Sequence, residues 1–375
     1  VLKAFRYRLY PTKAQQTKIN AVLESLRWVY NETLAVRKNS WEQECKSISL
    51  FKTNKLLTGW KKERLELNSV FSQVLQDAQV RVDLAFKAFF RRVKAGEKEV
   101  GYPRFKGHGR YDSLTYTQFG FKLGKDKLTL AKIGAVRVNV HRPVQGKIRR
   151  ITVRRTSTGK MFVSIMAEVL SNPLPFKDGS VVGADVGLES FATLSNGEKI
   201  SNPRFFRTEE VELVKAQRKL SAEKKSSEKW RKRLKVVQRV HERIANKRSN
   251  FVHQESHKLV NRFGIIAFED LNIKGMQQNN NCGLAKSITD ASWGMFVNAA
   301  RNKAEEAGSK VVLVNPKFTS QACSRCGLIV KKDLSERTHL CECGLVMDRD
   351  LNAAINILRL GLQSLSQTGI EAHAL

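Results

Sequence analysis

The sequence predicts a multi-domain α/β protein: a small β-barrel with an inserted helical block, then an α/β half that carries a short cysteine-rich segment. Its 375 residues are enough for two or three structural units of roughly 150 residues each. Short β-prone runs recur at close spacing between residues 116 and 170, which is typical of a barrel. After residue 180 a β-hairpin precedes alternating helices and strands, which is typical of an α/β fold.

The first hundred residues predict one strand and a helical block. Residues 3–10 alternate apolar and mostly cationic side chains, as a strand with one buried face does. Thr12 and Gln15 form a capping box, so a helix begins there, and further helices are expected over 41–66 and 68–95. Because the other β-prone runs come later, we expect the first strand to complete the barrel and the helices to be an insertion into it.

A basic, glycine-punctuated loop at residues 101–112 separates these helices from the other barrel strands. It is either a linker or a phosphate contact, because it carries aromatic as well as cationic side chains. The barrel strands are expected at 127–130, 135–140, 148–154 and 161–169.

The second half follows an expected linker at 171–179, where two prolines occur. An Asn196-Gly197 turn predicts a hairpin between two strands. Strands are expected at 181–187, 191–194, 198–201, 265–268 and 311–314, and helices are expected as a pair within 207–260, near 288–307 and from 350 to about 360.

Charge restricts the class of partner. The chain carries 67 Lys and Arg against 35 Asp and Glu, a formal charge of +32, and such an excess favours a nucleic acid. With 41% hydrophobic residues the composition is that of a folded protein rather than a disordered basic tail. No apolar run approaches the roughly 20 residues that cross a bilayer, and the N-terminus lacks a signal core, so we expect neither secretion nor membrane insertion.

The cysteines predict a reducing location, because four of the six cluster instead of spreading over a disulfide framework. We expect a cytoplasmic protein that is associated with the nucleoid when active. Since the chain starts at Val1, we also expect one or more residues to precede it.

Lys and Arg crowd one predicted helix between residues 224 and 239, outside a narrow apolar stripe. Such a run is either a solvated helix face or a nucleic-acid contact, and the overall charge favours the contact. Arg231 and Arg233 are therefore candidate contacts.

Three carboxylates stand at positions that predict metal-dependent chemistry. Asp185 lies inside an apolar strand, Glu269 ends another, and Asp350 starts the last helix. Burying an ionised carboxylate is costly unless a cation compensates it, and carboxylates around a pair of Mg²⁺ ions suit phosphodiester hydrolysis. A single such acid is more often a cap or turn residue. Spacing also leaves three nearby acids open as substitutes, namely Asp270, Asp290 and Asp348.

A second set of candidate metal ligands is Cys323-x-x-Cys326 followed by Cys341-x-Cys343, with a glycine after each pair. Two close thiol pairs bridged by a short loop predict a tetrahedral structural Zn²⁺ site. The second pair has one intervening residue where two are commoner, so His339 could replace one sulfur. The remaining cysteines, Cys45 and Cys282, are expected to be free thiols.

Several segments together resemble one known family along nearly the whole chain. They are Arg-Leu-Tyr-Pro-Thr at 8–12, Phe-Phe-Arg-Arg at 89–92, Gly-Tyr-Pro-Arg-Phe-Lys at 101–106, Gly-Ala-Asp-Val-Gly-Leu at 183–188, Phe-Glu-Asp-Leu-Asn-Ile at 268–273, Thr-Ser-Gln-x-Cys-Ser-x-Cys-Gly at 319–327 and Asp-Arg-Asp-Leu-Asn-Ala-Ala-Ile-Asn-Ile at 348–357. The combination resembles TnpB, the OrfB-type protein of bacterial insertion sequences, from a family regarded as ancestral to type V CRISPR effectors.

The resemblance implies an organisation into four parts. These are a wedge-like barrel at 1–11 and 101–175, an inserted helical recognition domain at 12–100, an RNase H-like RuvC nuclease domain at 176–317 and 345–375, and a zinc-ribbon insertion at 318–344.

The resemblance also assigns roles to residues. By motif, the RuvC acids are Asp185, Glu269 and Asp350, the last rather than Asp348 because it directly precedes Leu-Asn-Ala-Ala. Gln76 matches, loosely, a position at which relatives read the short motif beside the DNA target. The expected nucleic-acid contacts are Gln76, Arg91, Arg92, Arg104, Lys106, Arg231 and Arg233.

The function that the resemblance implies is an RNA-guided, Mg²⁺-dependent DNA endonuclease. It would bind a guide RNA from the transposon end and cleave target double-stranded DNA beside a transposon-adjacent motif, with two Mg²⁺ ions at the acids and with Zn²⁺ at the cysteines. We expect a monomer on its RNA. Three alternatives stay open: a guide-directed DNA-binding repressor without cleavage, a strand-joining transposase, and a zinc-ribbon RNA-binding protein without catalysis, which leaves the buried acids unexplained.

Overall fold

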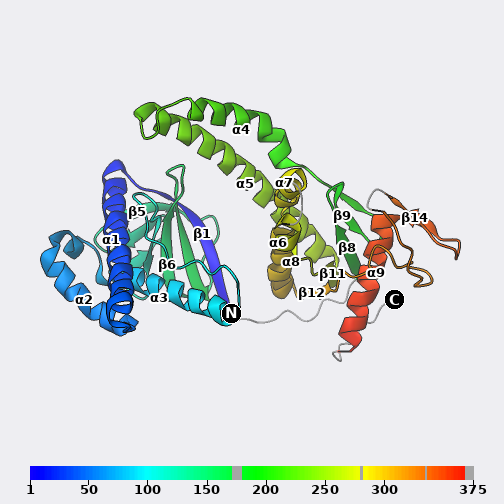
Figure 1. Cartoon of the computed structure of the whole chain (residues 1–375), viewed down its shortest axis with the longest axis horizontal. Helices are drawn as coiled ribbons and strands as arrows, with labels where there is room; N and C mark the ends of the chain where they lie inside the picture. The colour runs from blue at the N-terminus through cyan, green and yellow to red at the C-terminus, as the bar shows by residue number, and fades with distance from the viewer. Residues whose placement is uncertain (171–179, 279–281, 334–335, 368–375) are drawn as a thin grey trace. The chain divides into compact units, whose positions relative to one another are not determined.

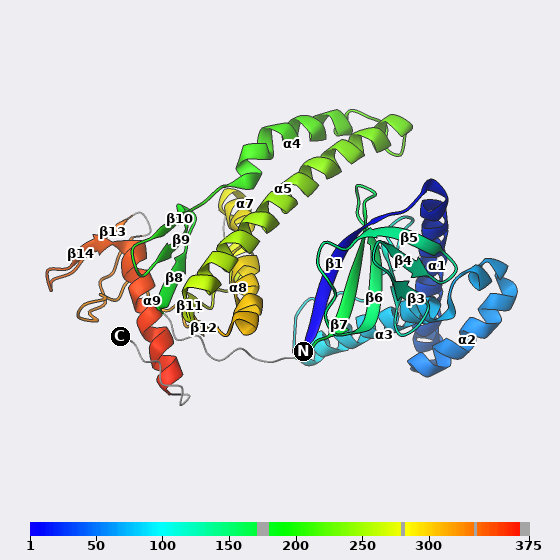
Figure 2. The same cartoon turned by 180° about the vertical axis from the view of Figure 1, so that it is seen from behind.

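The computed structural model describes residues 1–170, 180–278, 282–333 and 336–367. The chain forms two compact units, Val1–Ser171 and Asn172–Leu375, which are drawn from opposite sides in Figure 1 and Figure 2. The linker expected at 171–179 lies outside the described residues. Within the described parts of the chain, no helix has the length and apolar content needed to cross a membrane.

A seven-stranded antiparallel sheet forms the core of the first unit. Strand β1 (Leu2–Tyr10) lies between β7 (Met161–Glu168) and β5 (Gly134–Asn139), so the N-terminal strand completes the sheet as predicted. The strand order is β2-β6-β7-β1-β5-β4-β3, with β2 at Ser113–Tyr116, β3 at Phe121–Leu123, β4 at Lys127–Leu130 and β6 at Lys147–Arg155.

This sheet is nearly closed, which is the coarse form of the predicted barrel. Its edge strands are β2 and β3, and the Tyr116 hydroxyl at the end of β2 donates to the carbonyl of Ala131, 2.9 Å away and just after β4. The two edges therefore approach each other around one apolar core. Strands β2 and β3, of four and three residues, were not predicted.

The predicted helical insertion lies between β1 and β2. It consists of α1 (Lys13–Glu44), α2 (Leu50–Glu63), a short 3₁₀ helix (Leu65–Ser69) and α3 (Ser72–Lys94). The capping box at Thr12 and Gln15 is present. The expectation of a helix over 41–66 was wrong, because α1 continues to Glu44 and ends at Cys45 in a left-handed conformation (φ 51°).

The second unit is built on a five-stranded sheet of order β10-β9-β8-β11-β12. Strands β8 (Val181–Val186), β11 (Ile265–Glu269) and β12 (Lys310–Val314) are parallel, whereas β9 (Ser190–Leu194) and β10 (Lys199–Ser201) form the predicted hairpin. Gly197 takes φ 89° in the Asn-Gly turn of this hairpin, a conformation that glycine adopts without strain.

Helices cover both faces of this sheet (Figure 1). Helices α5 (Glu228–Arg262) and α8 (Trp293–Ala307) pack on one face, and α9 (Arg349–Ser366) packs on the other. Helix α4 (Phe205–Ser221) pairs with α5, as predicted from the pattern over 207–260, and α6 (Ile273–Gln278) and α7 (Cys282–Ala291) precede α8.

The single helix expected near 288–307 is two helices, because Ser292 takes a left-handed conformation (φ 58°) between α7 and α8. Helix α9 also ends at Ser366, beyond the expected end near residue 360.

Helix α9 lies unusually close to the sheet. A Cβ atom on Gly183 of β8 would lie 2.1 Å from the carbonyl oxygen of Ala354, and one on Gly361 would lie 2.7 Å from Cβ of Ala267 on β11. Only glycine at both positions allows this approach. One turn of helix and two residues of strand each span about 6 Å. Asp350 lies one turn before Ala354 on α9, and Asp185 lies two residues after Gly183 on β8. The close approach of Gly183 to Ala354 therefore places Asp350 near Asp185.

Candidate active site and metal centre

Two of the candidate acids lie on adjacent parallel strands. Ala184 of β8 is in register with Phe268 of β11, so Asp185 and Glu269 follow side by side. Alternate residues of a strand point to the same face. Gly183 and Ala267 contact α9, and Asp185 and Glu269 therefore project toward the same side of the sheet as α9.

The third acid, Asp350, sits in the first turn of α9. The turn is fixed by Asp348, whose Oδ1 accepts hydrogen bonds from the amides of Asp350 (2.9 Å) and Leu351 (3.0 Å). The other oxygen of Asp348 lies 2.8 Å from Nζ of Lys199 on β10. The two acids of the Asp-Arg-Asp segment therefore differ in role. Asp348 caps the helix, whereas Asp350 lies near Asp185 of the sheet.

The electrostatics of Asp185 reflect this arrangement. Burial, followed by the nearby charges of Glu269 and Asp350, raises the pKa of Asp185 well above its usual range, and Arg349 opposes the shift. Burial also raises the pKa of Glu269, against a hydrogen bond from Thr319. A buried carboxylate that two other carboxylates repel destabilises the fold unless a cation offsets the negative charge. Their oxygen atoms are the ligands that Mg²⁺ prefers.

The three substitute acids occupy other environments. Asp348 is the helix cap described above. Asp290 accepts from the amide of Phe206 (2.8 Å) and from Arg248 (2.7 Å), so its carboxylate joins α4, α5 and α7. Asp270 is exposed to solvent. Position and contacts therefore favour Asp185, Glu269 and Asp350 over these substitutes as the candidate site.

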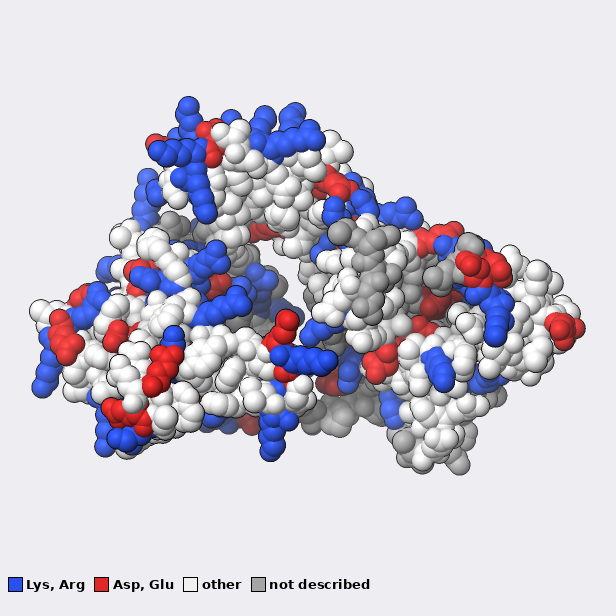
Figure 3. Space-filling view, viewed as in Figure 1, with Lys and Arg blue, Asp and Glu red and all other residues white. Residues whose placement is uncertain are grey.

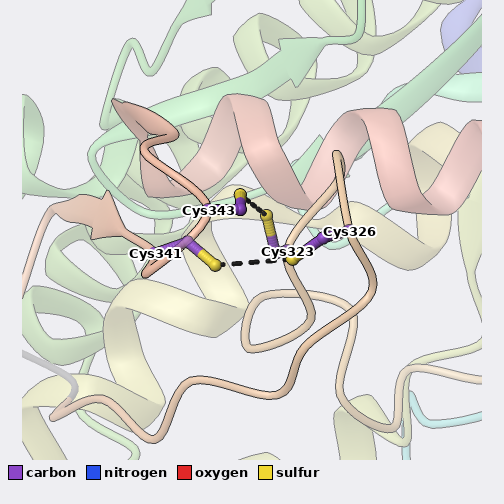
Figure 4. A group of neighbouring side chains, drawn as sticks. All are labelled: Cys323, Cys326, Cys341 and Cys343. Atoms are coloured by element: carbon purple, nitrogen blue, oxygen red, sulfur yellow. Dashed lines mark hydrogen bonds between the residues drawn. The ribbon is translucent and has the colours of Figure 1, made fainter.

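The four predicted zinc ligands meet at one point (Figure 4). The sulfur atoms of Cys323 and Cys343 are 3.6 Å apart, those of Cys326 and Cys341 are 3.5 Å apart, and all four lie within 4.8 Å of one another. Zn–S bonds of about 2.3 Å in a tetrahedron place sulfur atoms about 3.8 Å apart. The cysteines therefore fit a tetrahedral Zn²⁺ ion, and the short Cys341-x-Cys343 spacing does not prevent it.

Ionisation of one of these thiols is favoured locally. Burial opposes it, but hydrogen bonds from the backbone amides of Cys326 and Arg325 and from the side chains of His339 and Cys343 together lower the pKa of Cys323 to about 5. A thiolate is the form that binds zinc.

His339 is not needed as a ligand. Four sulfur atoms already complete the group, and His339 is fully buried with its Nδ1 beside Nζ of Lys332. It lies on β13 (Thr338–Leu340), which pairs with β14 (Val346–Asp348) in the hairpin that carries the second cysteine pair. Cys45 is exposed and free, as predicted, whereas the side chain of Cys282 is outside the description.

The two candidate ligand sets differ in how closely their ligand atoms approach one another. Among the described residues, the four cysteines are the only group of three or more His, Cys, Asp or Glu side chains whose ligand atoms converge on a single ion-sized point. The carboxylates of Glu269 and Asp350 instead lie near enough to Asp185 to raise its pKa, without forming such a group.

Sequence reasoning missed three polar residues that join these two sets. Thr319 donates its hydroxyl to Oε1 of Glu269. Asn352 and Asn356 of α9, both buried, hydrogen-bond the backbone around the first cysteine pair. The available signal was their spacing: two asparagines one turn apart, on the apolar face of an otherwise hydrophobic helix, require buried polar partners.

The predicted nucleic-acid contacts of the first unit lie on α3 and on the loop after it. Gln76 and Arg91 are exposed on α3, whereas Arg92 donates to the carbonyl of Gly101, 3.1 Å away. Arg104 is exposed in the loop, and the backbone of Lys106 exchanges two hydrogen bonds with the Asn31 side chain on α1. The loop is therefore anchored to the helical block and is not a free linker.

The predicted contacts of the second unit lie at the far end of the α4–α5 hairpin, where Figure 3 shows Lys and Arg gathered. Arg231 and Arg233 are both exposed there, and Arg233 Nε lies 3.9 Å from Glu223. These two arginines lie in a different unit from the other five predicted contacts, and neither set is adjacent to the acids in sequence.

Models of known families match three segments of the chain. A model described as "Probable transposase" matches residues 164–280, one described as "Cas12f1-like, TNB domain" matches 293–357, and one described as "Helix-turn-helix domain" matches 1–46. The last description differs from the structure, in which residues 1–46 hold strand β1 and the single helix α1.

Along 96% of its length the chain is 36% identical to a protein of Streptomyces pristinaespiralis, and the match covers 90% of that relative. This chain belongs to the TnpB (OrfB) family. The Streptomyces member is named "Putative RNA-guided DNA endonuclease". A member from Escherichia coli K12, named "Putative RNA-guided DNA endonuclease InsQ", is 31% identical over 91% of this chain and 87% of its own.

The family fold also occurs among solved structures. One is titled as a cryo-EM structure of a Cas12f1–sgRNA–target DNA complex; it matches this chain with a TM-score of 0.59 at 12% identity, over 95% of this chain and 98% of its own. At that identity the match shows a shared fold. The predicted resemblance to TnpB is confirmed by the family models and the two relatives.

Proposed function

We propose that this protein is an RNA-guided endonuclease that hydrolyses target double-stranded DNA at Asp185, Glu269 and Asp350. One observation carries the proposal: the buried Asp185 of β8 lies near the carboxylates of Glu269 on β11 and Asp350 on α9, in a chain of charge +32. The names of the two relatives support the guide RNA and the DNA target. A polyanionic substrate is also what offsets the cationic surplus.

Asp185, Glu269 and Asp350 would hold two Mg²⁺ ions, because Asp185 lies near both of the other carboxylates. Such a pair of ions supplies an activated water and stabilises the leaving oxygen of the phosphodiester. The protein's part is to keep the ligands in place. The parallel register sets Asp185 beside Glu269, the Asp348 cap fixes the first turn that carries Asp350, and partial burial strengthens each interaction with a cation.

The remaining parts of the chain take supporting roles in this proposal. Residues 1–11 and 101–175 form the wedge, 12–100 the recognition domain, 176–317 and 345–375 the RuvC domain, and 318–344 a zinc-ribbon held by four thiolates. Base pairing with the guide reads the target, over a heteroduplex on the order of 20 base pairs, while cationic side chains contact its backbone. Gln76 is the candidate reader of the transposon-adjacent motif.

The test is cleavage by the protein purified with the RNA that accompanies it, after that RNA has been sequenced and a matching target prepared. In Mg²⁺ we expect the wild type to cut and Asp185→Ala to be slower by about a thousandfold, which corresponds to about 4 kcal/mol of lost transition-state stabilisation. Asp270→Ala is the matched control, because this neighbouring acid is exposed, and it should cut at the wild-type rate.

Three outcomes would contradict the proposal. Guide-dependent DNA binding without cutting by the wild type indicates a repressor. Strand-joined products formed without RNA indicate a transposase. Equal cutting by wild type and Asp185→Ala places the chemistry elsewhere.

A further inference from the structure

One hydrogen bond from a neighbouring side chain holds one of the two oxygen atoms of the Glu269 carboxylate. Among the described residues, the hydroxyl of Thr319 is the one side-chain group that hydrogen-bonds Glu269, and it engages Oε1. Oε2 is left for another partner. A glutamate has several rotatable bonds, and Glu269 is repelled by Asp185, so without this contact its carboxylate would be free to turn away.

Thr319 is itself firmly fixed. Its side chain is 4% exposed, and its carbonyl oxygen accepts a hydrogen bond of 2.9 Å from Nδ2 of Asn356 on α9. Phe318, directly before it, takes φ 65°, a conformation that non-glycine residues adopt only when their surroundings hold them there. Thr319 is therefore a fixed point from which the Glu269 carboxylate can be oriented.

The same helix clamps the first cysteine pair. Nδ2 of Asn352 donates to the carbonyl of Ala322 (2.8 Å), and Oδ1 of Asn352 accepts from the amide of Ser324 (2.9 Å). Asn356 also donates to Ala322, 2.7 Å away. Both neighbours of Cys323 are thus tied to the first two turns of α9, the helix that starts with Asp350.

From these contacts we infer that Thr319 is a positioning residue for Glu269, and that the cysteine segment, through Thr319 and the Asn352–Asn356 clamp, forms one wall of the acidic site. The inference rests on the proposed function, because it concerns how the acids bind divalent cations. Groups that hydrogen-bond a metal ligand orient it, and their loss typically weakens metal binding by tenfold or more. The thiol cluster therefore supports the geometry of the acidic site as well as the local fold.

The test measures cation binding directly, with Mn²⁺ as the probe and electron paramagnetic resonance of free Mn²⁺ as the readout, on the full chain with its RNA. Thr319→Val keeps the side-chain shape and removes the hydroxyl, and it should weaken Mn²⁺ binding by about tenfold. Thr319→Ser restores a hydroxyl and should bind within about twofold of the wild type. Thr33→Val is the matched control, because this fully buried threonine donates only to the carbonyl of Val29 on its own helix.

The outcomes separate this inference from the proposed function. Wild-type Mn²⁺ affinity in Thr319→Val, with affinity lost in Asp185→Ala, overturns the inference and leaves the endonuclease proposal in place. Unchanged affinity in Asp185→Ala overturns the proposed function itself. Equal weakening in Thr319→Val and Thr33→Val also overturns the inference, because a general loss of stability then explains the effect.

Discussion

The cysteine cluster and the carboxylate cluster are both sets of metal ligands in one unit, but they are built in opposite ways. The cysteines span only 20 positions of sequence, and their sulfurs converge within 4.8 Å. The carboxylates come from two strands and a helix distributed over the whole unit, and Glu269 and Asp350 lie near Asp185 without their ligand atoms converging on one point. A closed set of four soft ligands suits a structural Zn²⁺, whereas an open set of hard ligands leaves positions for water and substrate.

The comparison shows where the stability of each site comes from. The thiol set is positioned to be held together by a single ion, because its four sulfur atoms lie within 4.8 Å of one another. The acidic set depends on the surrounding fold: a parallel register, a helix at close range and a hydroxyl from the neighbouring segment. Substitutions should therefore damage the two sites through different mechanisms.

The largest effect is expected from removing a thiolate. Cys323→Ala should lose the bound Zn²⁺ and melt the segment around residues 319–348, at a cost of about 5 kcal/mol or more, because metal binding supplies most of its folding free energy. Zinc content by atomic emission and protease sensitivity of the segment measure this change. Cys45→Ser, at an exposed free cysteine, should retain one Zn²⁺ per chain. If Cys323→Ala keeps its zinc, the closed site described above does not exist.

The next effect tests the close approach of α9. Gly183→Ala places a methyl group 2.1 Å from the carbonyl of Ala354, and the resulting displacement should cost about 3 kcal/mol in the free energy of unfolding. Urea denaturation of the second unit measures it. Gly59→Ala in α2 has open space around the new methyl group and should stabilise the first unit by up to about 1 kcal/mol. Equal stability of wild type and Gly183→Ala would mean that α9 sits farther from β8.

A smaller effect of opposite sign is expected from neutralising the central acid. Because the folded-state pKa of Asp185 is raised above the unfolded-state value of about 4, this residue lowers the stability of the fold at any pH above that value. Without divalent cations, Asp185→Asn should raise the melting temperature at pH 7 by about 2–4 °C, as a stabilisation of about 1 kcal/mol does in a unit of this size. The difference should shrink as the pH falls toward 4. Lower stability of Asp185→Asn at pH 7 would contradict the strained arrangement of acids.

The smallest effect concerns a residue outside both sites. Arg233→Ala removes one exposed cation of α5 and should weaken RNA binding slightly and nearly independently of sequence, with the slope of log affinity against log salt reduced by about one. Filter binding between 50 and 300 mM KCl measures the slope. Val236→Ala, at a nearby exposed apolar position, should leave the slope unchanged. An equal change in both variants would exclude a phosphate contact at Arg233.

The sequence predicted best what depends on local pattern. The capping box at Thr12, the Asn-Gly hairpin and the cysteine pairs each involve residues a few positions apart, and each is present in the structure. The break between α7 and α8 was missed because it depends on one serine in a left-handed conformation, which no local composition announces. The end of α1 at Cys45 was missed for the same reason.

The sequence indicated three acids as a candidate site, but not the contacts that hold them in place. Choosing Asp350 over Asp348 relied on a family motif, and the structure supplies the physical difference, since Asp348 is engaged as a cap and by Lys199. The contact between Thr319 and Glu269 joins residues 50 positions apart. Such a contact follows from tertiary packing alone, so no spacing rule could have indicated it.

The two faces of β8 pack against different parts of the unit, and this restricts insertions and deletions in the strand. Its odd-numbered residues meet α9 and the acids, while Val182, Ala184 and Val186 pack into the aromatic core with Phe191 and Phe296. Deleting or inserting a single residue between Gly183 and Asp185 would exchange the two faces and turn the carboxylate into that core. Length variation in this part of the chain is therefore expected in the turns that follow β8, where an added residue leaves the phase of β8 intact.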